Sequence, residues 1–265
     1  MLISQMNVQE LLEAVAGYQP IAPATRKGWQ YAIRGIEETP VDAIGKRFVV
    51  LRRTKLNTMG YKQSYVRTQL GYCGSIWQIA MEQMALVDEN PWRGSLKGLD
   101  KGEKDYPYLP LSHYVEAGLG NHPIFMGLWY HGFRVNELAC ISPEELILDH
   151  PVPHFKLKST AIRGIKNRKS MREVPIHPLY LAGGFLNDFR FTTNPKAGDN
   201  FSRWMKTRSG HSAPGIRHNI VTRMRQAGIE YSIAAAILGH DATGMTSKYG
   251  KILLEDKLDQ LQKLR

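Results

Sequence analysis

Cysteines and long apolar runs are scarce in this sequence. Its 265 residues contain two cysteines, Cys73 and Cys140, both in apolar surroundings. They are too few and too far apart to build a metal site, so we expect two small buried residues in a reducing cytoplasm. No stretch approaches the roughly 20 apolar residues of a membrane span, and the N-terminus does not resemble a signal peptide. The sequence therefore predicts a cytoplasmic protein without a metal, another cofactor or a membrane segment.

Acidic residues are absent from two long segments of the C-terminal half. The first lies between Asp149 and Glu173 and contains seven basic residues; the second lies between Asp199 and Glu230 and contains six. A surface that is merely soluble would intersperse both signs of charge. With a net charge of +11, the two basic segments favour a polyanionic partner, with nucleic acid first among the candidates.

The first third of the chain has the hydrophobic spacing of helices. Val8, Leu11, Leu12 and Val15 follow a helical pattern within residues 7–17. Further helices are expected from a cap at Thr25, over 41–53, and over 61–87, where Asn90-Pro91 follows. Residues 96–110 lack a hydrophobic period. We therefore predict a helical domain over 1–95 and a linker over 96–110.

The remaining residues, 111–265, predict a second domain of mixed type. Helices are expected over 112–120 and 121–140, and again towards the C-terminus. Between them, three short strand-like pieces cover 154–159, 161–166 and 171–176. The fold class is thus mainly α, with one small three-stranded antiparallel sheet. The amphipathic tail, 251–265, either packs on its own domain or docks on a neighbouring subunit.

Two segments of this second domain carry basic residues in unusual positions. In GFRVNEL (132–138), Arg134 lies in an otherwise apolar helix, three residues before Glu137. A buried arginine must be paired or bound to an anion, so either an Arg134–Glu137 ion pair or an anion site is expected. The predicted hairpin over 165–176 turns at 166–170. A lysine there could protonate a leaving group, or the turn could simply be solvated.

Two later segments contain a second arginine of interest and a histidine–tyrosine pair. PGIRH (214–218) opens a predicted helix, and Arg217 in its first turn would lie where the helix dipole favours an anion. A surface arginine is the alternative. LGH (238–240) is followed by Tyr249, nine positions after His240. Each residue alone would usually be structural.

The order and spacing of these motifs resemble the tyrosine recombinase family of phage integrases and Xer-type recombinases. That family carries Gly-x-Arg-x-x-Glu-Leu, a hairpin lysine before a Val-Pro strand, His-x-x-Arg-His, Leu-Gly-His and a tyrosine nine residues later. This chain has GFRVNEL, KNRKSMREVPI, PGIRH, LGH and Tyr249 in that order. The motifs cover about 112–250. The resemblance implies a helical core-binding domain followed by a mixed α/β catalytic domain.

The resemblance also implies a role for each matching residue. Tyr249 would attack a DNA phosphate and form a 3′-phosphotyrosyl intermediate, while Arg134 and Arg217 grip that phosphate. Guanidinium forks suit a phosphate better than ammonium groups do. His240 would hydrogen-bond the same phosphate, and Glu137 would orient Arg134. This chemistry requires no metal, since arginines stabilise the extra charge, and the sequence has no ATP-binding GxxxxGK[ST] motif.

The leaving oxygen would take its proton from Lys166, with Lys169 as the second candidate because the register of the turn is uncertain. One departure from the family pattern is Pro214, which replaces the usual histidine three residues before the second arginine. His211 is a tentative substitute. Further DNA contacts are expected from the following basic residues: Arg52, Arg53, Lys55, Arg67, Arg163, Arg168, Lys169, Arg203 and Lys206.

The expected partners are double-stranded DNA, three further copies of the chain in a synaptic tetramer, and accessory DNA-bending proteins. Two other interpretations remain open from the sequence. The chain could be a DNA-binding relative whose catalysis is weakened by Pro214, or a type IB topoisomerase that shares the chemistry. The two-domain layout and the short tail favour a recombinase over a topoisomerase.

Overall fold

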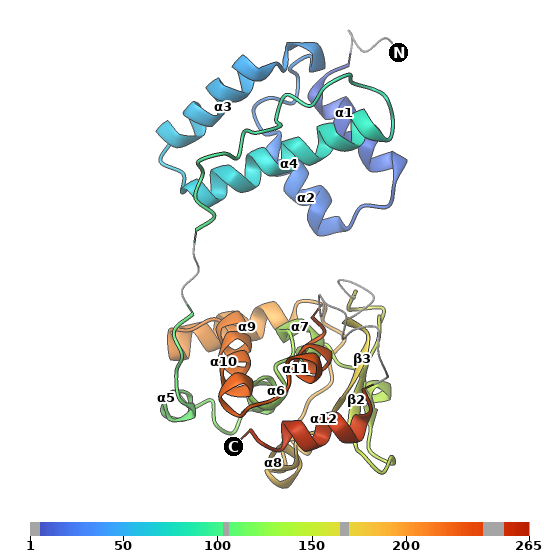
Figure 1. Ribbon diagram of the computed structural model, residues 1–265, viewed down its shortest axis with the longest axis vertical. Helices are drawn as coiled ribbons and strands as arrows, with labels where there is room; N and C mark the ends of the chain where they lie inside the picture. Colours follow the sequence, from blue (N-terminus) through green and yellow to red (C-terminus); the bar gives the residue numbers. More distant parts are fainter. Residues whose placement is uncertain (1–5, 103–105, 165–169, 241–251, 265) are drawn as a thin grey trace. The chain divides into compact units, whose positions relative to one another are not determined.

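A computed structural model describes residues 6–102, 106–164, 170–240 and 252–264 (Figure 1). The chain forms two compact units, Met1–Lys104 and Asp105–Arg265, and each is considered by itself. The boundary falls inside the segment that the sequence predicts as a linker. None of the helices in the described ranges is long and apolar enough to cross a membrane.

The N-terminal unit is built around one long helix. The helices are α1 (Val8–Tyr18), α2 (Pro23–Ala32), η2 (Val41–Ala43), α3 (Lys46–Thr58) and α4 (Gln63–Glu82), and the other three α-helices all contact α4 (Figure 1). The apolar stripe predicted for α1 is fully buried. Helical spacing therefore located the core face of this unit correctly.

Three details of these helices differ from the sequence prediction. The second helix begins at Pro23, whose fixed φ suits the first helical position, so Thr25 lies inside the helix and is not its cap. The predicted helix over 41–53 is interrupted, because Gly45 has extended backbone and caps α3. The fourth helix ends at Glu82, before the predicted 87.

Residues 96–102 of the predicted linker pack onto the N-terminal unit. Arg53 donates to the carbonyls of Ser95 (3.2 Å) and Lys97 (2.9 Å). Arg67 donates to the carbonyls of Leu96 (3.1 Å) and Leu99 (3.2 Å), and the Leu99 side chain is buried in the core. Two arginines thus satisfy backbone carbonyls that have no partner in a helix or sheet.

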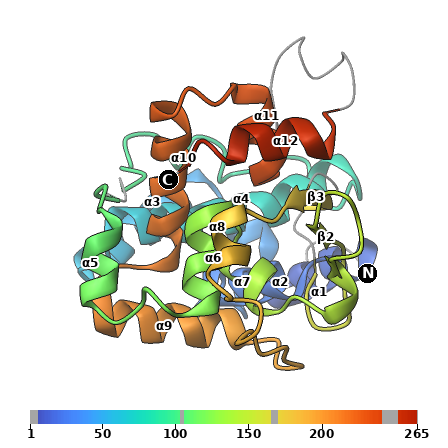
Figure 2. The same cartoon turned by 90° about the horizontal axis from the view of Figure 1, so that it is seen from below.

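The C-terminal unit packs helices against one side of a small sheet (Figures 1 and 2). Its elements in chain order are α5 (Leu111–Glu116), α6 (Pro123–His131), α7 (Val135–Ala139), η3 (Pro143–Glu145), β1 (Leu146–Ile147), β2 (His154–Leu157), β3 (Arg172–Pro175), α8 (Pro178–Ala182), α9 (Ala197–Ser209), α10 (Ala213–Gln226), α11 (Tyr231–Leu238) and α12 (Leu254–Leu261). The apolar α6 crosses the centre and is buried along its length. A mainly helical fold with one small sheet is confirmed.

The sheet is antiparallel in the order β1-β2-β3, with Phe155 paired to Leu146 on one side and to Val174 on the other. The prediction of three antiparallel strands is confirmed, but the prediction of a strand over 161–166 is wrong for its described part. Residues 160–163 form a turn, since the backbone N–H groups of Thr160 and Arg163 donate to each other's carbonyls. The short β1 takes the place of that strand.

Gly132 divides the helix that was predicted over 121–140. Its φ of +65° is left-handed and ends α6, and a Cβ there would meet Leu238 Cδ2 at 2.6 Å and Ile220 Cγ2 at 2.7 Å. Only glycine fits this backbone and this close approach. The break makes Arg134 the N-cap residue of α7, outside the apolar helix in which it was expected.

The C-terminal tail packs on its own unit, which is the first of the two alternatives raised by the sequence. Lys257 Nζ on α12 donates to the Glu173 carbonyl (2.8 Å), and His177 Nε2 donates to the Leu264 carbonyl (2.9 Å). Leu261 and Leu264 are buried in the core. The tail therefore completes the hydrophobic core of the unit that carries it.

Lowering the pH from 7 to 5 should destabilise the protein through His131. This fully buried ring accepts the His177 N–H at Nε2 (2.8 Å), so its proton is on Nδ1, which donates to the Gly127 carbonyl (2.9 Å). Burial lowers the pKa of His131 to about 3. The unfolded chain binds this proton near pH 6.5 whereas the folded chain does not, so stability falls as the pH drops from 6.5 towards 3.

At pH 5 the loss should be about 2 kcal/mol. Urea unfolding at pH 7 and pH 5 measures it, with His131→Gln as the comparison, because this variant has no proton to bind there. Most carboxylates remain ionised in this range, so they contribute little to the difference. An equal pH dependence in both proteins would contradict the argument.

Candidate functional site

Arg134 and Glu137 are joined at the start of α7. The Arg134 backbone N–H donates to Glu137 Oε2 (2.9 Å), and its Nη1 donates to Glu137 Oε1 (2.5 Å) and to Ser170 Oγ (3.1 Å). The ion pair considered from the sequence is therefore present. The Arg134 side chain is still 30% exposed, whereas that of Glu137 is 9% exposed. A fixed but accessible guanidinium group results.

Arg172 is a second partner of the same carboxylate, and no motif in the sequence assigned it a role. Its Nη2 and Nη1 donate to Glu137 Oε2 (2.9 Å) and Oε1 (3.3 Å), and its Nε donates to the Ile237 carbonyl (2.6 Å). One signal could have revealed it. In the strand Arg-Glu-Val-Pro, Arg172 and buried Val174 are two residues apart and so point to the same face. An arginine that faces a core needs a carboxylate.

Arg217 connects three segments of the C-terminal unit. Its Nη1 donates to the Gly132 carbonyl, and its Nη2 donates to the Leu238 carbonyl and to His240 Nε2, the last at 3.0 Å. It is the fifth residue of α10 and therefore begins the second turn. The sequence had suggested that it lies in the first turn. Its orientation therefore comes from tertiary contacts more than from the helix terminus.

Burial and neighbouring cations disfavour further positive charge in this cluster. Burial, followed by the charges of Arg134 and Arg172, lowers the pKa of Arg217 to about 10. Burial and then the charge of Arg217 also lower the pKa of His240, so its imidazole is neutral at pH 7. Both shifts mean that additional positive charge is costly here, and a bound anion would reverse them.

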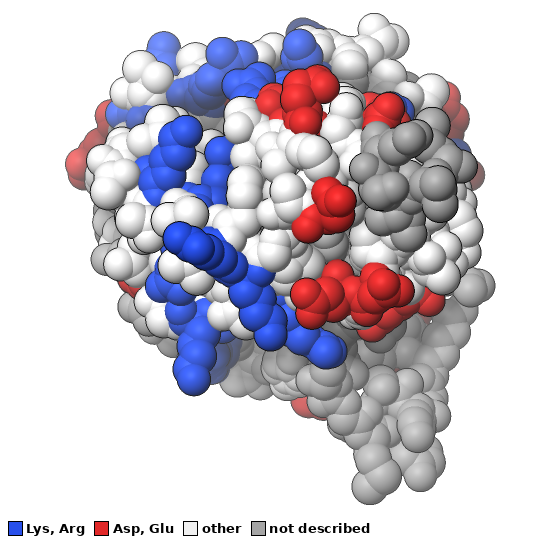
Figure 3. Space-filling view, turned by 90° about the horizontal axis from the view of Figure 1, so that it is seen from above, with Lys and Arg blue, Asp and Glu red and all other residues white. Residues whose placement is uncertain are grey.

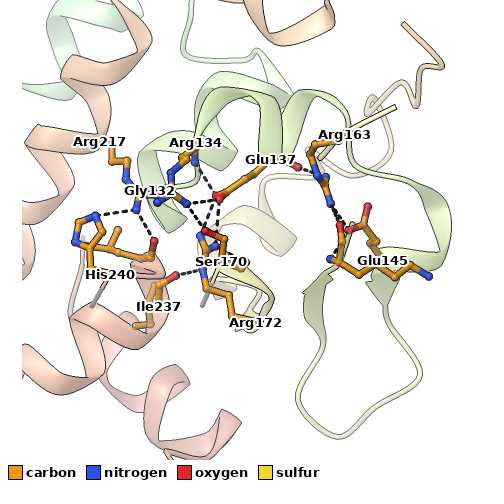
Figure 4. Close-up of polar contacts among 12 residues, drawn as sticks. Gly132, Arg134, Glu137, Glu145, Arg163, Ser170, Arg172, Arg217, Ile237 and His240 are labelled. Carbon is orange, nitrogen blue, oxygen red and sulfur yellow. Dashed lines mark hydrogen bonds and ion pairs between the residues drawn. The ribbon is translucent and has the colours of Figure 1, made fainter. Parts of the chain in front are cut away.

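Figure 4 shows these residues around Glu137 and Gly132. Arg134 and Arg172 contact the Glu137 carboxylate, and Arg217 contacts His240, so three guanidinium groups share one counter-charge and leave an excess of two positive charges beside a neutral imidazole. Two forked cations with an accessible face suit a phosphate group. Within the part of the chain that the structure describes, no group of His, Cys, Asp or Glu side chains could hold a metal ion.

Several predicted site residues lie outside the described residues, namely Tyr249, Lys166, Arg168 and Lys169. Their roles stay predictions. The described residues next to them in the chain, Ser170 and His240, contact Arg134 and Arg217.

His211 is not brought to this cluster. Its ring lies 5.3 Å from that of His113 and 6.5 Å from that of Tyr114, both on α5. No hydrogen bond between described residues joins it to Arg134, Arg217 or His240. Pro214, at the position of the missing histidine, is the exposed second residue of α10. The described structure therefore offers no replacement for that histidine.

The residues predicted to contact DNA fall into two groups. Lys55, Arg203 and Lys206 are exposed. The half-buried Arg52, Arg53 and Arg67 donate to backbone carbonyls of their own unit. In a space-filling view from above, most Lys and Arg lie toward the left and top of the face and most Asp and Glu lie to the right of them, with a few acidic side chains at the left edge (Figure 3). The charges are thus segregated, as a surface for a polyanion requires.

The structure corrects the expectation that Arg163 contacts DNA. Its side chain is 4% exposed and forms an ion pair with the fully buried Glu145. It also donates to the carbonyls of Glu137 (2.6 Å), Cys140 (3.3 Å) and Lys158 (2.8 Å). A guanidinium group with these partners has no surface for a phosphate, so Arg163 stabilises the turn after β2.

Comparison with solved structures gives the fold. A Tn1549 transposon integrase in complex with transposon right end DNA has a TM-score of 0.65 at 15% identity, over 98% of this chain and 99% of that chain. A lambda integrase dimer bound to a COC′ core site has a TM-score of 0.64 at 15% identity, over 94% and 100%. No protein-family model and no curated protein matches the sequence. The chain has the fold of the tyrosine-recombinase integrases.

Arg163→Met should lower the free energy of unfolding by about 3 kcal/mol, because it leaves the Glu145 carboxylate buried without its ion-pair partner. Arg203→Met, at an exposed arginine, should change stability by less than about 0.5 kcal/mol. Urea unfolding measures both. If Arg163→Met kept full stability but lost DNA affinity, the assignment of Arg163 to the fold would be refuted.

Proposed function

We propose that this chain, which has the fold of the tyrosine-recombinase integrases, is a site-specific DNA recombinase. It would cleave and rejoin DNA through a 3′-phosphotyrosyl intermediate, without a metal. The observation that carries the proposal is the half-buried cluster of Arg134, Arg172 and Arg217 with a single counter-charge, Glu137. Such a cluster has a net positive charge that an incoming phosphodiester can neutralise.

Arg134 and Arg217 would hold the two non-bridging oxygens of the scissile phosphate. Attack by the Tyr249 oxygen on phosphorus adds negative charge to those oxygens, and guanidinium groups already in place stabilise it more in the transition state than in the ground state. The contacts of Arg217 with Gly132 and Leu238 support this role, because they fix its guanidinium group before DNA arrives.

The bond from phosphorus to the 5′ oxygen breaks as the bond to Tyr249 forms; the phenol would lose its proton to solvent, and Lys166 would give its proton to the departing oxygen. Lys169 is the second candidate for that donor. In the reverse step a 5′-hydroxyl attacks phosphorus and returns its proton to the lysine, while the tyrosine leaves and takes a proton from solvent. The bond energy is stored in the phosphotyrosine, so rejoining needs no nucleotide cofactor.

His240 would give the phosphate a further hydrogen bond. Its imidazole is neutral in the free protein, where Nε2 accepts from Arg217. A bound phosphate would offset the neighbouring cations and raise the pKa of His240, so that Nε2 could carry a proton and donate. Glu137, held ionised by Arg172 and Arg134, would keep Arg134 oriented.

Double-stranded DNA is the proposed substrate. The integrases of similar fold were solved with DNA, including a lambda integrase tetramer bound to a Holliday junction. We extend that assembly to this chain as a homotetramer on two sites, acting in the cytoplasm with or without accessory DNA-bending proteins. Lys55, Arg203 and Lys206 are the exposed cations that we assign to backbone phosphates, together with Arg168 and Lys169.

A nicked suicide substrate tests the chemistry, because loss of a short fragment traps the covalent intermediate. The wild-type protein should give a protein–DNA adduct, and Tyr249→Phe should give none. Tyr231→Phe, at an exposed tyrosine on α11, is the matched control and should react normally. Absence of any wild-type adduct would indicate a DNA-binding relative without catalysis, and relaxation of supercoils at no preferred site would indicate a topoisomerase.

Replacing Arg203 or Lys206 with alanine should weaken duplex binding equally for all sequences. Each change removes one phosphate contact, so the slope of log affinity against log salt should decrease in size by about one. Fluorescence anisotropy at several salt concentrations measures this. Lys263→Ala, beyond α12, is the control. An equal loss in the control would show that only overall charge matters.

A further inference from the structure

Arg172 has a guanidinium group whose three nitrogens are all engaged. Nε donates to the Ile237 carbonyl (2.6 Å), Nη2 to Glu137 Oε2 (2.9 Å), and Nη1 to the Ser170 carbonyl (3.0 Å) and Glu137 Oε1 (3.3 Å). Its side chain is 5% exposed, against 30% for Arg134. Arg172 therefore has no face to offer a phosphate, although it lies within the cationic cluster (Figure 4).

The partners of Arg172 belong to three separate parts of the site. Glu137 orients Arg134 at the start of α7. Ser170 directly follows the segment 165–169, and its hydroxyl group accepts from Arg134. Ile237 is at the end of α11, next to Leu238, whose carbonyl accepts from Arg217. One side chain thus contacts the carboxylate that holds Arg134, the residue whose hydroxyl group accepts from Arg134, and the helix end whose next carbonyl accepts from Arg217.

The packing around Arg172 is an independent sign that its position is fixed. A Cβ on Gly239 would lie 2.9 Å from Arg172 Nη1, 3.1 Å from Cζ and 3.2 Å from Cδ, and Gly239 has a φ of +66°. On another side, the Phe133 ring lies 5.8 Å from Arg172 Cζ. The glycine between Leu238 and His240 therefore leaves room for this guanidinium group.

Arg172 also keeps the Glu137 carboxylate ionised. Burial opposes ionisation of Glu137, but the charge and hydrogen bonds of Arg172, with those of Arg134, lower its pKa. Each oxygen of Glu137 accepts hydrogen bonds from both arginines. Without Arg172, Arg134 would be the only guanidinium group that holds the Glu137 carboxylate in place.

We propose that Arg172 is a positioning residue, which holds Glu137, Ser170 and the end of α11 in register so that Arg134, Arg217 and His240 converge on one phosphate. This inference rests on the proposed function. It assigns Arg172 to the geometry of the reaction and not to DNA affinity.

Arg172→Met in the full chain should slow single-turnover cleavage of the suicide substrate by about 100-fold, as expected for a misplacement of roughly 1 Å. Duplex affinity, measured by anisotropy, should stay within about threefold, because Arg172 contacts no phosphate. Arg172→Lys should recover only part of the rate, since an ammonium group cannot form the fork to Glu137. Cleavage within threefold of wild type, or a matching loss of affinity, would overturn the proposal.

Gly239→Ala provides a second variant that keeps Arg172 but displaces it. It should slow cleavage in the wild-type background, and the additional loss in an Arg172→Met background should be smaller, because the guanidinium group it would strike is gone. Fully independent losses in the double variant would overturn the proposal. If Arg172→Met does not fold, Gly239→Ala is compared with Gly228→Ala, a left-handed glycine with open space around it, and equal cleavage in the two would overturn it.

The imidazole titration of His240, followed by NMR in the free protein, separates this inference from the proposed function. Burial and then Arg217, Arg134 and Arg172 lower the pKa of His240, so Arg172→Met should move it back towards its ordinary value. If the wild-type protein forms no adduct, but Arg172→Met still shifts the His240 titration, only the recombinase proposal would be refuted. An unchanged titration would refute the positioning role alone.

Discussion

The site depends on one buried carboxylate that serves two arginines. Glu137 lies at the start of a five-residue helix, accepts from Arg134 and Arg172, and is the only acidic side chain in the cluster drawn around Gly132 in Figure 4. A buried carboxylate needs cationic partners, and buried guanidinium groups need acceptors. The carboxylate therefore holds both guanidinium groups and is held by them, and the surplus of positive charge is directed to where Arg134 and Arg217 are accessible.

The fold supplies this constraint through a single break in the backbone. At Gly132 the apolar α6 ends, and its left-handed conformation places Arg134 as the cap of α7. The carbonyl of Gly132 then accepts from Arg217 on α10, while Ile220 and Leu238 close over the glycine. Packing of α6 against α10 thus brings together two arginines that are far apart in the sequence. A side chain at 132 would separate those elements.

Much of this site could be predicted because local patterns record it. The motif order located Arg134, Glu137, Arg217 and His240, and the structure brings these four together. Helical spacing also found the buried stripe of α1. Helix boundaries were predicted less well, since a left-handed glycine such as Gly132 can end a helix while the apolar pattern of the sequence continues past it. Such a break depends on Ile220 and Leu238, which are distant in the sequence.

The roles of the other arginines could not be read from charge alone. Arg163 and Arg172 lie in the same acid-free segment, yet one is paired with Glu145 below the surface and the other with Glu137 in the site. Because these partners are distant in the chain, the local sequence gives no sign of them, except that alternation along the strand places Arg172 on its buried face. The acid-free segment therefore has two functions: its exposed cations add to the positive surface, while its buried arginines form ion pairs with buried carboxylates. Without the buried pairs, the cluster would lack the rigidity that distinguishes a preorganised anion site from a basic patch.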